Sequence, residues 1–341
     1  MGVWIVIRWG LFCLFERFYG SSKTAIEEQL DLVEYADTIG FDEAWFGEHH
    51  FNDFSVCPSP SLLLANISAR TKNIRLGVAG YLAPFYDVVR LAEEIAILDI
   101  LSGGRMNLGF AKGAFAPDSK HFKVQPENLR KAMFESVEAI SNLLLGNNSD
   151  FVGEFVNYSN VDIEPKPIQP KIPIHIATFS SAQSIEFAAR NGFALMASQG
   201  LSLDECEKMS DYYESIAKEA PKIILMRTFC VGDTDEKAIK QARPAIDHFV
   251  KSMKSASSFA KSPVYDEKKY ASLIGEREIF FDGSKFLECG IIGSATTCIK
   301  QIEQIKKRFE NITIALKPTG TSFKTNKIFL RRFNEQIRPY C

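Results

Sequence analysis

The chain has 341 residues, 46% of them hydrophobic and 24% charged, and its 40 basic and 42 acidic residues leave a formal net charge of −2. This composition excludes a disordered chain, which would be poorer in apolar residues and richer in charge. The balanced charge also argues against a protein that binds nucleic acid or an anionic membrane surface.

The first apolar run covers residues 3–15 (VWIVIRWGLFCLF) and is predicted to contain a buried strand at 9–15. A signal peptide is not expected, because Arg8 interrupts the run, no basic segment precedes it and no small-residue cleavage site follows it. The run is also too short, at 13 residues, to span a bilayer.

Further along the chain, short apolar runs alternate with amphipathic stretches that have helical spacing. In 24–39, for example, Leu30, Val33 and Ala36 share one helical face, and Gly40 ends the helix. The predicted strands are 9–15, 43–47, 73–81, 105–110, 173–177, 193–197, 222–231 and 311–317. The predicted helices are 24–39, 60–70, 88–100, 126–145, 181–191, 203–218, 235–259 and 328–337.

These alternating pairs predict an α/β fold with a parallel sheet, and eight is the number of strand–helix pairs that closes a (β/α)8 barrel. An open doubly wound sheet with a second domain is the alternative. It would need a glycine-rich fingerprint after the first strand, where the sequence reads CLFERFYGSSK. We therefore predict a single TIM-type barrel domain over residues 1–341.

Two stretches exceed the plain repeat and are predicted to be insertions. After the fourth strand, residues 151–164 alternate like a small hairpin. After the seventh strand, residues 252–290 are long and mixed in composition, as in a lid over an active site. A tolerated surface insertion would have the same sequence character.

The seven cysteines are irregularly spaced and form no C-x-x-C motif. This pattern predicts free thiols in a reducing compartment, hence a cytoplasmic protein. No H-E-x-x-H motif occurs, and the histidines other than the adjacent His49 and His50 are isolated. We therefore predict no metal site.

Active sites of (β/α)8 barrels lie at the carboxyl ends of the strands, and Glu48, His49 and His50 follow the second predicted strand. Adjacent residues that leave a strand point in opposite directions. One histidine can therefore face the barrel mouth as a general acid or base, or as a hydrogen-bond donor, while the other packs sideways. A purely structural pair is the alternative.

Other strand ends carry small or anion-binding residues. Ala79 and Gly80 follow the third strand and would let a flat ligand approach the backbone. Lys112 follows the fourth strand, and Ser180 and Ser181 begin a helix whose free N–H groups suit an anion. Together they indicate a flat, phosphate-bearing cofactor in the barrel mouth.

Several segments resemble the bacterial-luciferase-like flavin-dependent monooxygenase family. They are EAWFGEHHF at 43–51, TKNIRLGVAGYLAPFYDVVRLAEEIAILDILSGGRMNLGFAKG at 71–113, PIHIATFSSAQSIEFAARNG at 173–192 and GSATTCIKQI at 293–302. Their order and spacing cover nearly the whole chain.

The resemblance implies a barrel that uses reduced FMN and oxygen to oxygenate a small organic substrate through a flavin C4a-hydroperoxide. It also implies a separate flavin reductase as partner and a homodimer. A deazaflavin-dependent oxidoreductase on the same fold is one alternative, and a flavin-binding relative with little turnover is another.

Two positions of the motifs concern the reacting end of the flavin. His49 matches the catalytic histidine of the family. The Ala79–Gly80 bond matches a non-proline cis peptide beneath the isoalloxazine.

The remaining matches concern flavin binding. Lys112, Arg130, Ser181 and Ser184 match phosphate-binding positions, and Asp118 matches an aspartate that influences flavin affinity.

Three positions depart from luciferase itself. Lys112 replaces an arginine, Ala111 replaces a reactive cysteine, and Ser180, included here among the cofactor-binding residues, stands in place of a glutamate. These departures argue against light emission and a long-chain aldehyde substrate, but not against flavin.

Overall fold

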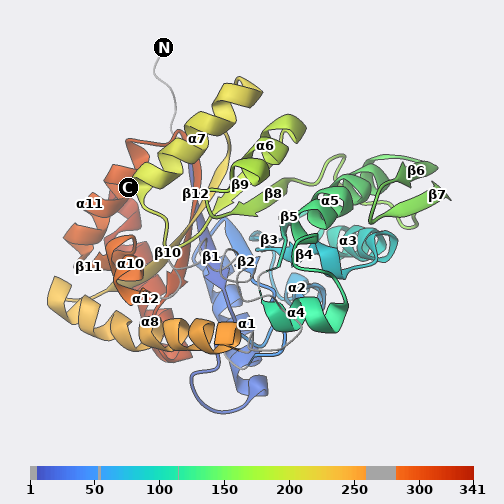
Figure 1. Cartoon of the computed structure of the whole chain (residues 1–341). Coiled ribbons are helices and arrows are strands. Elements are labelled where there is room, and N and C mark those ends of the chain that lie inside the picture. Colours follow the sequence, from blue (N-terminus) through green and yellow to red (C-terminus); the bar gives the residue numbers. More distant parts are fainter. Residues whose placement is uncertain (1–5, 53–54, 114, 259–281) are drawn as a thin grey trace.

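A closed parallel sheet forms the centre of the computed structural model, which describes residues 6–52, 55–113, 115–258 and 282–341 (Figure 1). Each strand of the barrel pairs with the next, and the last pairs with the first. The predicted (β/α)8 barrel is therefore confirmed. In order around the barrel the strands are β1 (Val6–Cys13), β2 (Glu43–Phe46), β3 (Arg75–Val78), β5 (Met106–Ala111), β8 (Ile174–Thr178), β9 (Ala194–Ala197), β10 (Ile223–Val231) and β12 (Asn311–Pro318).

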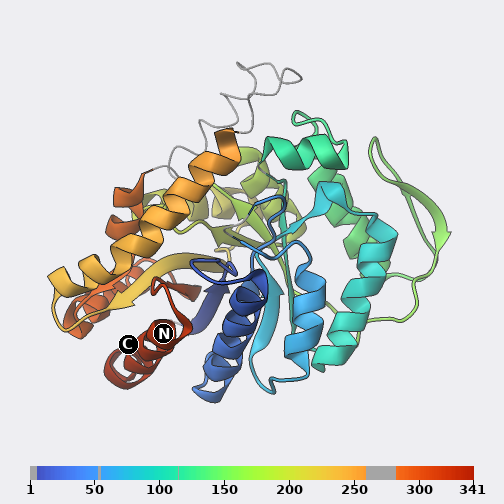
Figure 2. The same cartoon turned by 90° about the horizontal axis from the view of Figure 1, so that it is seen from below.

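Helices surround this sheet, as the view from below shows (Figure 2). Local signals explain their ends: the Asp87 side chain accepts from the Arg90 N–H at the start of α3, and Gly103 ends that helix with φ 67°. The predicted helices correspond to α1 (Ser22–Thr38), α2 (Pro60–Ser68), α3 (Val88–Ser102), α5 (Leu129–Leu145), α6 (Ala182–Asn191), α7 (Leu203–Ala217), α8 (Asp235–Ser258) and α12 (Phe323–Gln336).

The structure contains elements beyond the eight predicted strand–helix pairs. The short helix α4 precedes α5, and β11 pairs with the end of β10. These additional elements are β4 (Tyr81–Leu82), α4 (Ala116–Phe122), α10 (Gly283–Glu288), β11 (Ile291–Gly293) and α11 (Ala295–Lys306).

The boundaries of several predicted elements were wrong. The last predicted helix runs from Phe323 to Gln336 instead of 328–337, and the third predicted strand covers Arg75–Val78 instead of 73–81. The first strand runs from Val6 to Cys13 instead of 9–15, because Phe15 adopts a left-handed φ of 54° that breaks the extended chain. The fourth predicted helix begins at Leu129 instead of 126.

The hairpin predicted at 151–164 is present as β6 (Ser149–Val152) and β7 (Asn157–Val161), which pair antiparallel. The second predicted insertion is described only in part. Helix α8 extends through 252–258 and α10 begins at Gly283, while 259–281 lie outside the described residues. The lid stays a prediction.

The segment between β3 and β4 passes close to the backbone of β5. The intervening Ala79–Gly80 peptide bond is cis, as the resemblance implied. A Cβ on Gly80 would lie 2.8 Å from the backbone of Gly109, and a Cβ on Gly109 would lie 2.1 Å from the Val78 carbonyl oxygen. Both positions therefore require glycine, since any side chain would push the two strands apart.

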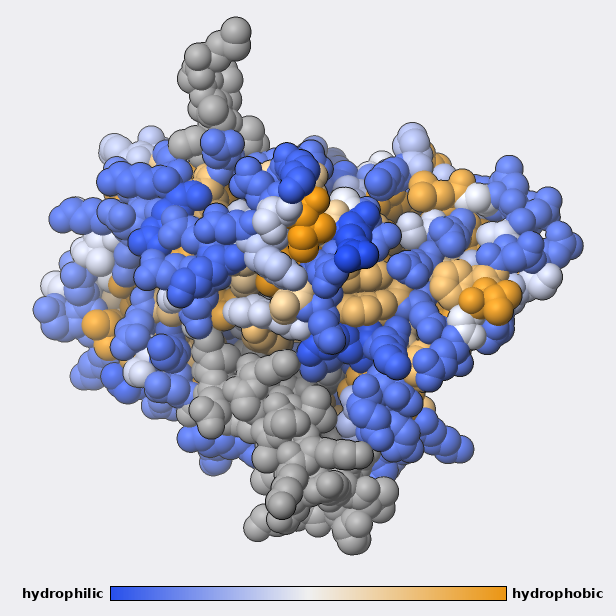
Figure 3. Space-filling view, turned by 45° about the horizontal axis from the view of Figure 1, so that its top comes forward, coloured by the Kyte–Doolittle hydropathy of each residue, from blue (hydrophilic) through white to orange (hydrophobic). Residues whose placement is uncertain are grey.

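Hydrophilic side chains cover most of the face seen in Figure 3, and hydrophobic ones appear there in small separate areas. Among the described helices, none combines the length and apolar character needed to cross a membrane.

We predict that Gly109→Ala destabilises the barrel, because its Cβ would have to displace the Val78 carbonyl. Overpacking of this kind costs about 1–3 kcal/mol or more. Urea unfolding would measure the change. Gly283→Ala is the control, because its Cβ would meet no atom closer than 3.4 Å, and it should lose little stability. Equal losses in the two variants would contradict this account.

Candidate functional site

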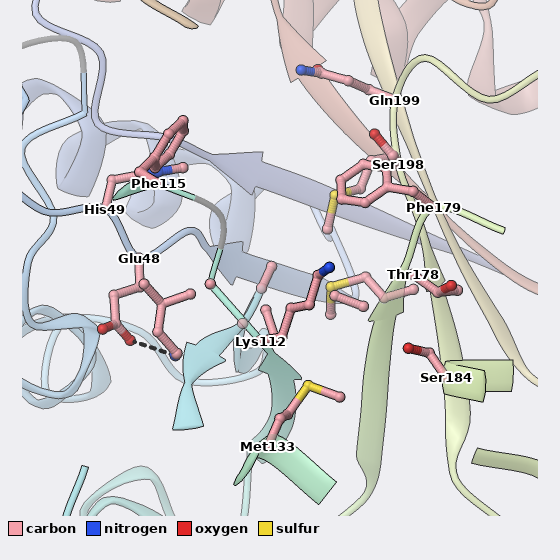
Figure 4. Close-up of a pocket in the computed structure, with 18 of the residues that line it drawn as sticks. Glu48, His49, Lys112, Phe115, Met133, Thr178, Phe179, Ser184, Ser198 and Gln199 are labelled. Atoms are coloured by element: carbon pink, nitrogen blue, oxygen red, sulfur yellow. Dashed lines mark hydrogen bonds between the residues drawn. The ribbon is translucent and has the colours of Figure 1, made fainter. Parts of the chain in front are cut away.

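A cavity lies at the carboxyl ends of the barrel strands (Figure 4), and its volume is about 1210 Å³ when the open solvent at its mouth is included. Its lining comes from the ends of β1, β2, β3, β5, β8, β9 and β10, and from α4, α5, α6 and α8. This is the end of the barrel at which the sequence predicted the site.

Most of the predicted site residues line this one cavity. They are His49, Ala79, Gly80, Lys112, Asp118, Arg130, Ser181 and Ser184. Ser180 is the exception: its side chain is exposed, it is not among the lining residues, and its φ of 68° turns the chain towards α6.

Glu48 ties the loop after β2 to β4. Its buried carboxylate accepts a hydrogen bond from the Leu82 N–H at 3.1 Å, and its Oε1 lies 2.8 Å from His50 Nε2. Burial raises the pKa of Glu48, and its hydrogen bond with His50 opposes that rise. His50 also packs edge-on against Phe122, with 4.9 Å between ring centroids. It is thus held outside the cavity lining, as predicted for the histidine that packs sideways.

His49 points the other way and lines the cavity near Phe115, with 6.0 Å between the ring centroids. Its backbone N–H donates to the Cys57 carbonyl at 3.1 Å, which anchors the loop. Burial lowers the pKa of His49 to about 4, and the neighbouring His50 acts in the same direction. The imidazole is therefore neutral at pH 7, with one N–H donor and one acceptor nitrogen.

Cationic and hydroxyl groups gather at another part of the cavity. Arg130, at the start of α5, donates through Nη1 to the Ser181 hydroxyl and to the Ser184 hydroxyl, the latter at 3.0 Å. Ser181 is the N-cap of α6, and Lys112 lines the same cavity from the end of β5. Two cations, two hydroxyls and a helix N-terminus suit a phosphate dianion. Their role as phosphate ligands stays a prediction.

Several lining residues were missed by the sequence analysis. Alternate residues of a barrel strand face inwards, but β9 (ALMA) and the first half of β10 (IILM) are apolar throughout, so no alternation marked Met196 and Met226. No signal marks the residues from loops and from α8 either. The missed lining residues include Thr178, Phe179, Met196, Ser198, Gln199, Met226, Phe249 and Met253.

Within the described part of the chain, no group of three or more His, Cys, Asp or Glu side chains is placed to hold a metal ion.

The chain is similar in sequence and in fold to known monooxygenases. A family model described as luciferase-like monooxygenase matches residues 7–309. The oxygenase component of flavin-dependent trigonelline monooxygenase from Acinetobacter baylyi is 28% identical over 350 residues, which cover 98% of this chain and 95% of that protein.

Two solved structures share the fold. Monooxygenase RslO1 from Streptomyces bottropensis superposes with a TM-score of 0.83 at 24% identity, covering 98% of this chain and 99% of that one. The oxygenating constituent of 3,6-diketocamphane monooxygenase from Pseudomonas putida, solved in complex with FMN, has a TM-score of 0.76 at 18% identity and covers 97% and 98% of the two chains.

We predict that His49 does not titrate near neutral pH in the folded protein. The midpoint should lie at about 4, instead of near the ordinary value of about 6.5. The imidazole proton resonance of His49, assigned by its loss in His49→Gln, would measure this midpoint. A midpoint near 6.5 would contradict the neutral imidazole.

The same pKa predicts a stability change with a definite sign. As the pH falls from about 6.5 towards 4, the unfolded chain takes up a proton on His49 before the folded chain does, so the folded state loses stability. His49→Gln removes this loss. Its free energy of unfolding should therefore fall less than that of the wild type over this range.

Proposed function

Because the chain belongs to the luciferase-like monooxygenase family, we propose that it is a flavin-dependent monooxygenase that uses reduced FMN and oxygen to oxygenate a small organic substrate. The observation that carries the proposal is that one cavity contains both groups that suit an anion and a neutral base. Arg130 contacts two serine hydroxyls, and Lys112 lines the same cavity. The neutral His49 lies near Phe115. The flavin-dependent relative and the fold shared with an FMN complex support the proposal.

The residues present fit FMN. Arg130, Ser181 and Ser184 would hold its phosphate, because charge-assisted bonds from a guanidinium and two hydroxyls match the phosphate oxygens. The Ala79–Gly80 segment would border the ring system, because these two small residues line the cavity.

Reduced FMN, when bound, supplies the two electrons with which one atom of dioxygen is transferred to the substrate and the other leaves as water. The chain's own residues prepare the site. His49 is neutral, so its imidazole has one unprotonated nitrogen that can accept a proton and one N–H that can donate a hydrogen bond. Phe12, Leu14 and Phe115 exclude water from the cavity, which limits side reactions.

We further propose a separate reductase as the source of reduced FMN, in line with the "oxygenase component" in the name of the Acinetobacter baylyi relative. A homodimer is also part of the proposal. Leu62 of α2 and Ile97, Ile100 and Leu101 of α3 are 41–72% exposed and offer apolar surface to a second copy. The seven free cysteines support a cytoplasmic location.

The proposed function is tested by mixing the protein with reduced FMN and then with oxygenated buffer. Bound flavin should reoxidise more slowly than free flavin, because the apolar walls limit water, and absorbance would follow the change. His49→Ala should alter this reoxidation much more than it alters FMN affinity. The exposed His121→Ala is the control and should alter neither.

Three outcomes would contradict the proposal. Binding of the deazaflavin coenzyme in preference to FMN would support the deazaflavin-dependent alternative. FMN binding without any effect on reoxidation would indicate a flavin-binding relative with little turnover. Unchanged reoxidation in His49→Ala would remove His49 from the reaction.

Arg130→Ala should weaken FMN binding by roughly ten- to a hundredfold, since a hydrogen bond to a charged group is worth about 1.5–3 kcal/mol. Riboflavin, which lacks the phosphate, should lose little affinity. Flavin fluorescence would measure both. Arg190→Ala is the matched control, because Arg190 lies on α6 with a side chain 69% exposed. Equal weakening of FMN and riboflavin would show that Arg130 does not contact the phosphate.

A further inference from the structure

One side of the cavity carries no charge. It is formed by the elements β9, β10, α8 and β1, and each described lining residue that they contribute is uncharged. These residues, the neutral wall, are Phe12, Leu14, Met196, Ser198, Gln199, Met226, Phe249 and Met253. The charged lining residues are Glu48, Lys112, Asp118 and Arg130, which come from the opposite half of the barrel.

Lys317 lies near the neutral wall, and its positive charge is compensated by the carboxylate of Glu16. Lys317 Nζ lies 5.0 Å from the ring centroid of Phe249, and it pairs with Glu16 at 2.9 Å. Both side chains of this pair are buried, at 3% and 8% exposed. The pair therefore offers no counter-ion to a charged group at the neutral wall. The buried Arg227 of β10 donates to the Ser198 and Met226 carbonyl oxygens and is not among the residues that line the cavity.

Ser198 and Gln199 are the polar residues of this otherwise apolar wall, and Gln199 has a polar atom that is unpartnered within the described part of the chain. It follows β9, it is 4% exposed, and its buried Oε1 has no hydrogen-bond partner among the described residues. In Figure 4, Gln199 and Ser198 lie across the cavity from His49 and Phe115. A buried amide oxygen without a donor is costly, so a ligand that brings a donor to it gains affinity.

We propose that the neutral wall is the substrate site, and that it selects an uncharged, largely apolar molecule with a hydroxyl group that bonds to Gln199. A hydroxyl suits an amide because each group can both donate and accept. This proposal rests on the proposed function, since it takes the cationic part of the cavity for the FMN phosphate. A substrate anchored at Gln199 lies on the side of the cavity that faces His49.

Three probes that share the naphthalene ring test the proposal: 2-naphthol carries a hydroxyl, naphthalene carries no polar group, and 2-naphthoate carries a carboxylate. Equilibrium dialysis would measure their binding to the protein with and without oxidised FMN. We expect 2-naphthol to bind more tightly than naphthalene and 2-naphthoate. Gln199→Met keeps the length of the side chain and should weaken 2-naphthol roughly tenfold, the size of one hydrogen bond, with no change for naphthalene. The exposed Gln241→Met is the control and should change neither.

Two results would overturn the proposal: tightest binding of 2-naphthoate, or equal weakening of 2-naphthol and naphthalene in Gln199→Met. Flavin fluorescence in the same variants separates this proposal from the proposed function. If FMN fails to bind, the proposed function fails, while dialysis of the FMN-free protein still decides whether Gln199 selects a hydroxyl.

Discussion

β10 pairs with β9 through Ile223–Leu225 and with β12 through Ile223–Phe229, and these two ladders close the parallel sheet. A closed sheet has no free edge, and it places the carboxyl ends of all its strands around one opening. The loops after the strands therefore meet over one cavity. Residues as distant in the sequence as Phe12 and Phe249 line it together.

Charged side chains line only part of the cavity, because they come from a few of the elements that surround it. Arg130 contacts Ser181, the N-cap of α6, and Lys112 lines the same cavity from the end of β5. On the opposite side the wall is neutral, and the buried Glu16–Lys317 pair cancels its own charge. His49 lies in the cavity as a neutral base, because burial lowers its pKa to about 4. An anion can be held in one part while another part stays apolar.

Much of the fold could be predicted, because helical and strand periodicity are properties of neighbouring residues. The alternation of eight pairs predicted the barrel, and the loop after β2 was recognised from Glu48, His49 and His50. The prediction was weaker where the chain departs from regular periodicity. Phe15 ends β1 early through its left-handed backbone, and α4 is a short helix in a segment for which no element was predicted. Ser180 is exposed and does not line the cavity, although its neighbour Ser181 does.

By itself, the sequence determined the order of strands and helices and the residue types at each strand end, since both depend on local pattern. Only the tertiary structure decided which of these side chains meet. Arg130 reaches Ser184 across 54 residues of sequence, and Glu48 receives its hydrogen bond from Leu82 of another strand. The burial that keeps His49 neutral, and the burial that leaves the Gln199 oxygen without a donor, arise from many distant residues at once. Such properties belong to the packed barrel, because desolvation depends on everything that surrounds a group and not on its neighbours in the chain.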